Sequence, residues 1–168
     1  RPSWREYVPE RGDIVIQLDP GMAFGTGLHP TTQMCLTVLE EKVQPGAEVL
    51  DLGAGSGILA IAAAMLGARR VLAVDNDPTA VKAARENAAA NGVDENVKLS
   101  CGSLPEVSGC YDLVAVNILA KVIVEMSREG LAKRVRPGGI LIATGILADQ
   151  EPKVVTALEQ EGLTLIER

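Results

Sequence analysis

Short apolar runs alternate with longer amphipathic segments through most of this sequence, and this alternation constrains the fold more than any other feature. The short runs are apolar at nearly every position, as in strands of a parallel sheet covered on both faces. The amphipathic segments supply the covering helices, so we predict an α/β fold with a doubly wound, mostly parallel sheet. The predicted strands are Ile14–Leu18, Glu48–Leu52, Arg70–Val74, Val97–Cys101, Leu113–Asn117, Ile140–Thr144 and Leu163–Ile166, and the predicted helices are Thr31–Lys42, Gly57–Leu66, Pro78–Ala90, Ala120–Arg134 and Gln150–Glu161.

A glycine-rich loop, DLGAGSG, follows the predicted strand that ends at Leu52, and ligands of such sheets bind at the carboxyl ends of strands. Gly53, Gly55 and Gly57 allow a sharp turn and a close approach of a ligand to the backbone. Their spacing is G-x-G-x-G, whereas the dinucleotide fingerprint is G-x-G-x-x-G. Asp51 suits a ligand with an amino group and a sulfonium better than a pyrophosphate. We therefore expect these four residues to bind S-adenosylmethionine, and a NAD enzyme is the least favoured alternative.

Two further strand ends contribute to the expected cofactor site. Asp75 follows the next predicted strand, where a carboxylate can accept hydrogen bonds from both ribose hydroxyls. Gly102 and Ser103 follow the third, at the position where adenine contacts are expected, and an ordinary turn is an equally good interpretation of this pair.

The segment from Leu18 to Thr32 concentrates glycines around one aromatic residue, Phe24, directly before a predicted helix. We expect it to fold over a bound ligand as a lid, with Phe24 excluding water from the catalytic site. Of the two threonines that begin the helix, one is expected to cap it and the other, Thr32, to face the cofactor. His29 is the sole histidine of the sequence, and a structural role is favoured over a catalytic one.

Asn117 ends a buried predicted strand, where an amide needs hydrogen-bond partners. Its carbonyl oxygen can accept a hydrogen bond from a substrate amine and direct the nitrogen lone pair toward a methyl group. We therefore predict that Asn117 is catalytic and also contacts the cofactor; a turn cap is the alternative.

Composition limits the classes of partner. The net charge of −6 and the 2% aromatic content argue against nucleic-acid binding, which favours a basic face or stacking rings. The three cysteines have no metal-ligand spacing and suit a reducing compartment, so no metal is expected. Neither a signal peptide nor an apolar run of transmembrane length is present, which favours a cytoplasmic protein without membrane contact. The oligomeric state is not predicted.

Several motifs in a fixed order resemble one family. They are LDPGMAFGTGLHPTT, VLDLGAGSGILAIAA, VDNDPTAV with NAAANG, NILA and ATGIL, and together they are similar to the ribosomal protein L11 methyltransferases of the bacterial PrmA type. The resemblance implies a Rossmann-like domain that transfers methyl groups from S-adenosylmethionine to the α-amine and lysine side chains of a basic large-subunit ribosomal protein. It places the family's cofactor positions on Thr32, Gly53, Asp75 and Asn117.

The resemblance also sets the expected domain organisation. Residues 1–30 are expected to form an N-terminal strand and the glycine-rich lid segment, and residues 31–168 the catalytic domain, without the family's N-terminal substrate-recognition domain. The family's last, antiparallel strand is also expected to be missing, which would leave Leu163–Ile166 frayed or paired with another chain. The alternatives are a methyltransferase for another protein lysine or a small molecule, and an inactive cofactor-binding fragment.

Overall fold

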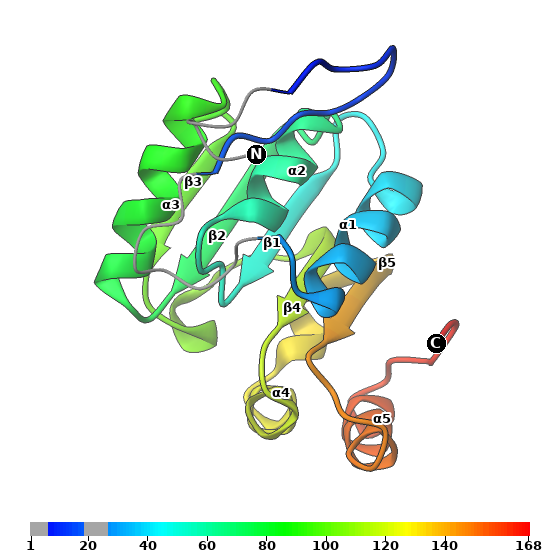
Figure 1. Ribbon diagram of the computed structural model, residues 1–168. Helices are drawn as coiled ribbons and strands as arrows, with labels where there is room; N and C mark the ends of the chain where they lie inside the picture. Colours follow the sequence, from blue (N-terminus) through cyan, green and yellow to red (C-terminus); the bar gives the residue numbers. More distant parts are fainter. Residues whose placement is uncertain (1–6, 19–26) are drawn as a thin grey trace.

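A five-stranded parallel sheet forms the centre of the molecule (Figure 1), as seen in a computed structural model that describes residues 7–18 and 27–168. The strand order is β3-β2-β1-β4-β5, so the direction in which strands are added reverses after β3. The fold is therefore the expected doubly wound α/β fold. The strands are β1 (Glu48–Leu52), β2 (Arg70–Asp75), β3 (Val97–Cys101), β4 (Tyr111–Asn117) and β5 (Val135–Thr144).

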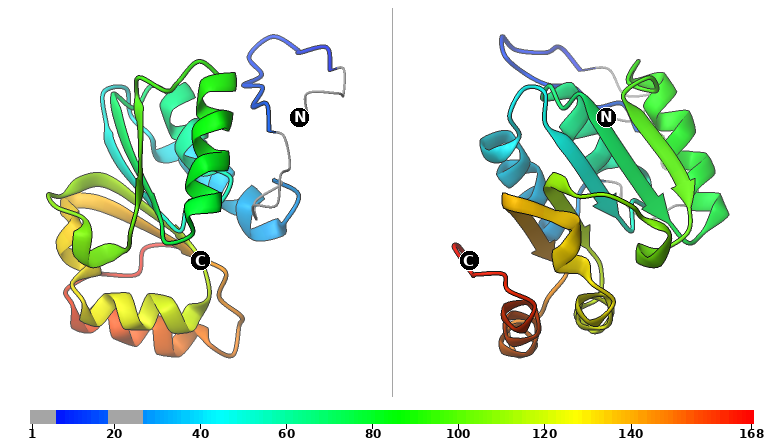
Figure 2. Two further views of the ribbon diagram at one scale, coloured as in Figure 1. Left: turned by 90° about the vertical axis from the view of Figure 1, so that its left-hand side faces the viewer. Right: turned by 180° about the vertical axis from the view of Figure 1, so that it is seen from behind.

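Helices cover both faces of the sheet (Figures 1 and 2). Of the helices in the described residues, three lie on one face and two on the other. Because the strands are parallel, the loops that follow β1, β2 and β4 lie at one edge of the sheet. The predicted helix over residues 120–134 ends early, because Gly130 adopts a left-handed conformation (φ +94°) and a 3₁₀ turn follows. The first face carries α1 (Pro30–Lys42), α2 (Ile58–Met65) and α3 (Pro78–Ala90); the second carries α4 (Ala120–Arg128) and α5 (Glu151–Gln160), with short 3₁₀ helices at Leu104–Glu106 and Leu131–Arg134.

Each face of the sheet has its own aliphatic core. Successive residues of a strand point to opposite faces, so Val49 packs with α1 and α2 while Leu50 packs with α4. The alternation explains why the central strands are apolar at almost every position.

Two predicted strands are not strands in the structure. Ile14–Leu18 runs as irregular chain, because the side-chain amide of Asn91 pairs with the backbone N–H and C=O of Gln17 in place of a neighbouring strand. Leu163–Ile166 also lies outside the sheet, and Leu165 and Ile166 are exposed. The expected fraying of this last segment agrees with its irregular path beside α5 (Figure 1).

Charged side chains join the amino ends of three strands. Arg136 of β5 forms ion pairs with Asp112 of β4 and, at 3.0 Å, with Glu48 of β1. The backbone N–H of Glu48 donates to the carboxylate of Asp112 at 2.8 Å, which together with the arginine holds the pKa of Asp112 below its usual value. This cluster lies at the edge opposite to the glycine loop.

Candidate cofactor and active site

The glycine loop between β1 and α2 adopts the strained conformation that its sequence predicts. Gly53, Gly55 and Gly57 have φ angles of +76°, +54° and +81°, a region that side chains disfavour. The N–H groups of Gly53 and Ala54 both donate to the carbonyl oxygen of Val74, at 2.8 and 3.2 Å. The loop is therefore fastened to the end of β2.

Asp75 organises the same loop from the end of β2. One carboxylate oxygen accepts the N–H of Gly55 at 2.8 Å, and the other accepts the N–H of Asp77 at 2.9 Å. A carboxylate offers about four acceptor positions, so each oxygen keeps capacity for one more donor. Asp75 is half-buried at the edge of the sheet, where a pair of hydroxyl groups can reach it.

Asp51 lies beneath the loop rather than on its surface. Its side chain is 1% exposed, and its Oδ2 accepts the N–H of Ala60 in the first turn of α2 at 3.1 Å. Burial raises the pKa of Asp51 to about 7, against the lowering effect of the Ala60 hydrogen bond. In the structure Asp51 supports the loop and the start of α2, and direct contact with a cofactor stays a prediction.

The protonation of Asp51 makes stability depend on pH. The folded protein keeps the proton up to about pH 7, whereas an unfolded aspartate releases it near 3.8. Folding therefore takes up a proton between these values, and the free energy of unfolding falls as pH rises through the window. We expect the free energy of unfolding of the wild type to fall by a few kcal/mol between about pH 4 and 7, and Asp51→Asn to lack this slope in urea denaturation. The exposed Asp94→Asn should keep the wild-type slope, and an unchanged slope in Asp51→Asn would contradict the assignment.

Asn117, at the end of β4, is paired with Thr32 of α1. Its amide nitrogen donates to the hydroxyl oxygen of Thr32 at 3.3 Å, and Thr32 is 2% exposed. The neighbouring residue of the register, Thr144 of β5, pairs in the same way with Cys35 of α1 at 3.0 Å. Two side-chain pairs thus fasten the first turns of α1 to the ends of β4 and β5. Asn117 and Thr32, which the sequence analysis both assigned to the cofactor site, are thus in hydrogen-bond contact.

The start of α1 differs in detail from the prediction. The cap is His29, whose Nδ1 accepts the N–H of Thr31 at 3.4 Å and lies 2.7 Å from its hydroxyl oxygen. The expected threonine cap is therefore wrong, and His29 has a structural contact as the cap of α1. Phe24, the predicted catalytic residue of the lid, lies outside the described residues.

Ser103 is engaged locally at the turn that follows β3. Its N–H and its hydroxyl group both contact the carboxylate of Glu106, at 2.8 and 3.2 Å, in a capping box. This geometry supports the turn interpretation, and an adenine contact by Ser103 stays a prediction.

Two contacts of the glycine loop were not predicted by the sequence analysis. Ile118, directly after Asn117, packs against Gly53 so closely that a Cβ there would lie 2.5 Å from its Cγ2 atom. Asn87 of α3 donates from its side chain to the carbonyl oxygen of Ser56 at 2.9 Å. A buried asparagine among alanines in NAAANG was the available signal for the second contact.

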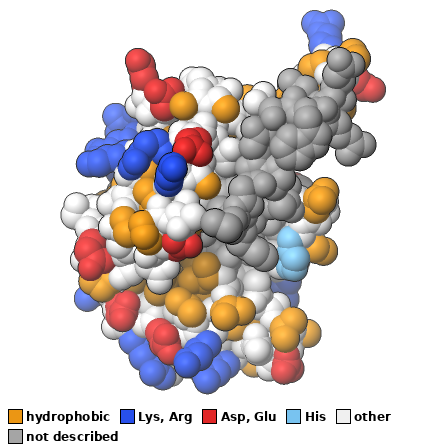
Figure 3. Space-filling model, turned by 60° about the vertical axis from the view of Figure 1, so that its left-hand side comes forward, with side chains coloured by type: hydrophobic (Ala, Val, Ile, Leu, Met, Phe, Trp, Pro, Cys, Tyr) orange, Lys and Arg blue, Asp and Glu red, His pale blue; other side chains and the backbone are white. Residues whose placement is uncertain are grey.

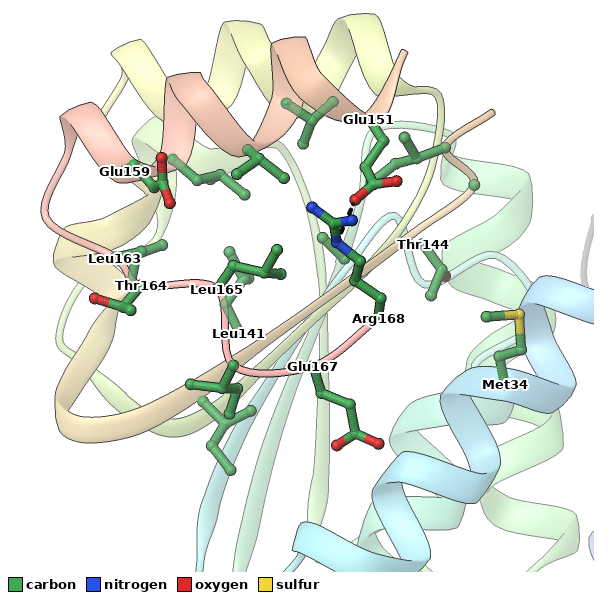
Figure 4. Close-up of a pocket in the computed structure, with 18 of the residues that line it drawn as sticks. Met34, Leu141, Thr144, Glu151, Glu159, Leu163, Thr164, Leu165, Glu167 and Arg168 are labelled. Carbon is green, nitrogen blue, oxygen red and sulfur yellow. Dashed lines mark ion pairs between the residues drawn. The ribbon is translucent and has the colours of Figure 1, made fainter. Parts of the chain in front are cut away.

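An apolar groove lies beside β5 and reaches the end of that strand at Thr144 (Figure 4). Leu141 of β5 and Leu165 of the C-terminal segment line it, and Arg168 forms an ion pair with Glu151 of α5 at 2.8 Å across its rim. Neither the glycine loop nor Asp75 contributes to its walls.

Within the parts of the chain that the structure describes, no group of three potential metal ligands occurs. None of the helices described is both long and apolar enough to cross a membrane. On the face shown in Figure 3, Lys and Arg side chains lie in separate groups with acidic and apolar side chains between them.

The fold and the site together define a class. A doubly wound parallel sheet, a G-x-G-x-G loop after its central strand and an acid after the neighbouring strand are the features of the Rossmann-like, S-adenosylmethionine-dependent methyltransferases.

The chain belongs to the ribosomal protein L11 methyltransferase (PrmA) family, whose sequence profile matches residues 1–168. It is 50% identical to the ribosomal protein L11 methyltransferase of Chloroflexus aurantiacus, over 99% of this chain and 58% of the relative. The enzyme of the same name from Pelotomaculum thermopropionicum is 52% identical, over 100% of this chain and 54% of the relative. The chain thus spans little more than half the length of these relatives.

The crystal structure of ribosomal protein L11 methylase from Lactobacillus delbrueckii subsp. bulgaricus has a similar fold. Its TM-score is 0.87 at 39% sequence identity, and the match covers 99% of this chain and 88% of that one. The expected family and fold class are therefore confirmed.

Proposed function

We propose that this chain carries the catalytic site of an S-adenosylmethionine-dependent protein N-methyltransferase. Its substrates are the α-amine and lysine side chains of a basic ribosomal protein of the large subunit. The names of its relatives, ribosomal protein L11 methyltransferases, support a ribosomal protein as the substrate. A cytoplasmic location follows from such a substrate.

One observation carries the proposal more than any other. The paired amide of Asn117 and the paired carboxylate of Asp75 follow β4 and β2, the two strands that flank β1 and its glycine loop. Ile118, directly after Asn117, packs on Gly53 of the glycine loop, and the same loop donates the N–H of Gly55 to Asp75. The groups proposed to hold a nucleoside and to orient an amine are thus both in contact with this loop or adjacent to a residue that is.

The residues present fit S-adenosylmethionine. Asp75 keeps an accepting position on each oxygen for the ribose hydroxyls, and the backbone of Gly53 is exposed at the edge of the sheet. The methionine part can approach the backbone of Gly53 and Gly55, which are exposed and partly exposed, whereas Gly57 is buried against Ala84 of α3 and shapes the turn. When bound, the cofactor supplies an electrophilic methyl group on its sulfonium.

Asn117 is oriented for a substrate amine by its bond to Thr32. Because its amide nitrogen donates to the Thr32 hydroxyl oxygen, its carbonyl oxygen is the atom left to accept a hydrogen bond. An amine N–H that donates to this oxygen turns its lone pair away from the amide. Most of the rate enhancement then comes from holding the amine nitrogen in line with the methyl group, since the reaction is an in-line displacement.

The amine must arrive without its extra proton. An α-amino group has a pKa near 8, so roughly a tenth is neutral at pH 7, whereas a lysine with a pKa near 10.4 is neutral in only about one molecule in 2,500. A site that accepts lysine therefore has to favour its neutral form by desolvation. The apolar side chain of Ile118 beside Asn117 is suited to this task.

The proposal is tested by methyl transfer from S-adenosylmethionine to the purified ribosomal protein, with the full-length enzyme and mass spectrometry of the product. A cell extract depleted of that protein is the comparison. We expect methylated α-amine and lysine residues in the ribosomal protein; transfer to other proteins or small molecules alone would contradict the substrate assignment.

Asn117→Ala should slow methyl transfer on the order of a hundredfold, because one oriented acceptor in a desolvated site is lost. Cofactor affinity should change less than about threefold. Thr32→Val, which removes the partner of the amide and keeps its volume, should give a smaller loss. Single-turnover rates and calorimetry provide the two quantities, and equal losses in both would indicate that Asn117 contacts only the cofactor.

A further inference from the structure

The motif NAAANG lies at the end of α3, beside the glycine loop. Its two asparagines, Asn87 and Asn91, are one helical turn apart and therefore lie on the same face of α3. Asn87 is 5% exposed, and a buried amide has to be hydrogen-bonded. The partners of the two amides show what this face of the helix does.

Asn87 holds the glycine loop. Its side-chain nitrogen donates to the carbonyl oxygen of Ser56 at 2.9 Å, between Gly55 and Gly57. One turn earlier on α3, Ala84 packs beneath Gly57, where an added Cβ would lie 2.9 Å from the Cβ of Ala84. The loop is thus fixed by Asp75 on one side of Ser56 and by α3 at Ser56 and Gly57.

Asn91 holds the N-terminal segment. Its amide nitrogen donates to the carbonyl oxygen of Gln17 at 2.7 Å, and its amide oxygen accepts the N–H of Gln17 at 2.8 Å. The same nitrogen lies 2.7 Å from the carbonyl oxygen of Asn87. One side chain therefore satisfies both backbone groups of a residue that no strand pairs, and it does so directly beside Asn87.

We propose that Asn87 and Asn91 are positioning residues that join the cofactor loop to the N-terminal segment through the last turn of α3. Asn87 sets the backbone of the glycine loop for the cofactor. Asn91 fixes Gln17 and thereby its neighbour Leu18, which is buried in the same core as Cys35 of α1, the helix from which Thr32 orients Asn117. The inference rests on the proposed methyltransferase function and assigns each asparagine a different kinetic effect.

The two variants should separate cofactor binding from transfer. Loss of one hydrogen bond at the loop should raise the Kd of S-adenosylmethionine about tenfold in Asn87→Ala. Asn91→Ala should keep this Kd within about twofold and lower the single-turnover rate of methyl transfer about fivefold. Calorimetry and single-turnover kinetics on the full-length protein measure the two effects.

Asn96→Ala is the matched control. Asn96 also donates from its amide to a backbone carbonyl, that of Arg69 at 3.2 Å, but at the amino ends of β2 and β3. This variant should change neither quantity. Asn87→Leu keeps a similar volume without the donor, so it retains the test if the alanine variant folds poorly.

Hydrogen exchange without cofactor supplies an independent measurement. The amides of Gly55 and Gly57 should exchange about tenfold faster in Asn87→Leu than in the wild type, and those of β3 should be unchanged. Parallel losses in binding, rate and thermal stability for all three asparagines, or wild-type exchange in the loop, would overturn the inference. If the wild-type protein itself bound no S-adenosylmethionine, the proposed function would fail instead.

Discussion

Asp75→Ala should weaken S-adenosylmethionine binding on the order of a hundredfold or more. The variant would remove the two charge-assisted hydrogen bonds that we propose Asp75 accepts from the ribose, each typically contributing about 1.5–3 kcal/mol. It also leaves the N–H groups of Gly55 and Asp77 without their acceptor, so the loop loses one of its fixed points. Isothermal titration calorimetry with the purified protein measures the change.

Asp77→Ala is the control for this experiment. Asp77 accepts the N–H of Thr79 at 2.8 Å and caps α3, so its loss should cost about 1 kcal/mol of folding free energy. Among the described residues, the Asp77 side chain forms no hydrogen bond or ion pair with the glycine loop, so the cofactor Kd should change by less than about threefold. An Asp75→Ala protein with wild-type affinity would refute the ribose assignment.

Gly57→Ala should damage both the stability of the fold and the binding of the cofactor. The residue has φ +81°, and its new Cβ would meet Ala84 at 2.9 Å from Cβ and 3.3 Å from Cα. Because the Cα atom belongs to the helix backbone, the clash is relieved only if the loop or α3 moves. We expect a loss of about 2–4 kcal/mol in unfolding free energy, combining left-handed strain with overpacking. Cofactor affinity should fall about tenfold or more, as the loop is displaced.

Gly109→Ala separates the two causes. Gly109 has nearly the same φ, +82°, but a Cβ there would meet nothing within 4 Å. This variant should therefore lose only the strain, about 1 kcal/mol, and keep wild-type cofactor affinity. Chemical denaturation and calorimetry on both variants provide the comparison. Equal losses in the two proteins would mean that the contact with Ala84 does not matter.

The parts of the site that could be predicted from the sequence are those built by neighbouring residues. The loop from Gly53 to Gly57 follows its own strand, and Asp75 ends the next one, so their place at the carboxyl edge follows from the alternation of elements. Asn117 was recognisable for the same reason, as a polar residue at the end of an apolar strand.

The contacts that were missed join residues far apart in the chain. Asn91 and Gln17 are separated by 74 positions, and Asn87 and Ser56 by 31, so no local pattern marks either pair. The strand predicted over 14–18 failed for this reason: the short apolar run is present, but the side chain of Asn91 occupies the backbone groups of Gln17 that a neighbouring strand would need. The cap of α1 was missed because histidine is not a common N-cap residue.

The ion cluster around Arg136 has a practical consequence for engineering. It binds the amino ends of β1, β4 and β5, while every group proposed to handle cofactor or amine follows the carboxyl end of a strand or lies on a helix beside it. Melting temperature and catalysis can therefore be adjusted at opposite ends of the same strands. Substitutions near Arg136 can raise the melting temperature of the enzyme without changing the Kd of its cofactor. Added salt should change the melting temperature more than this Kd.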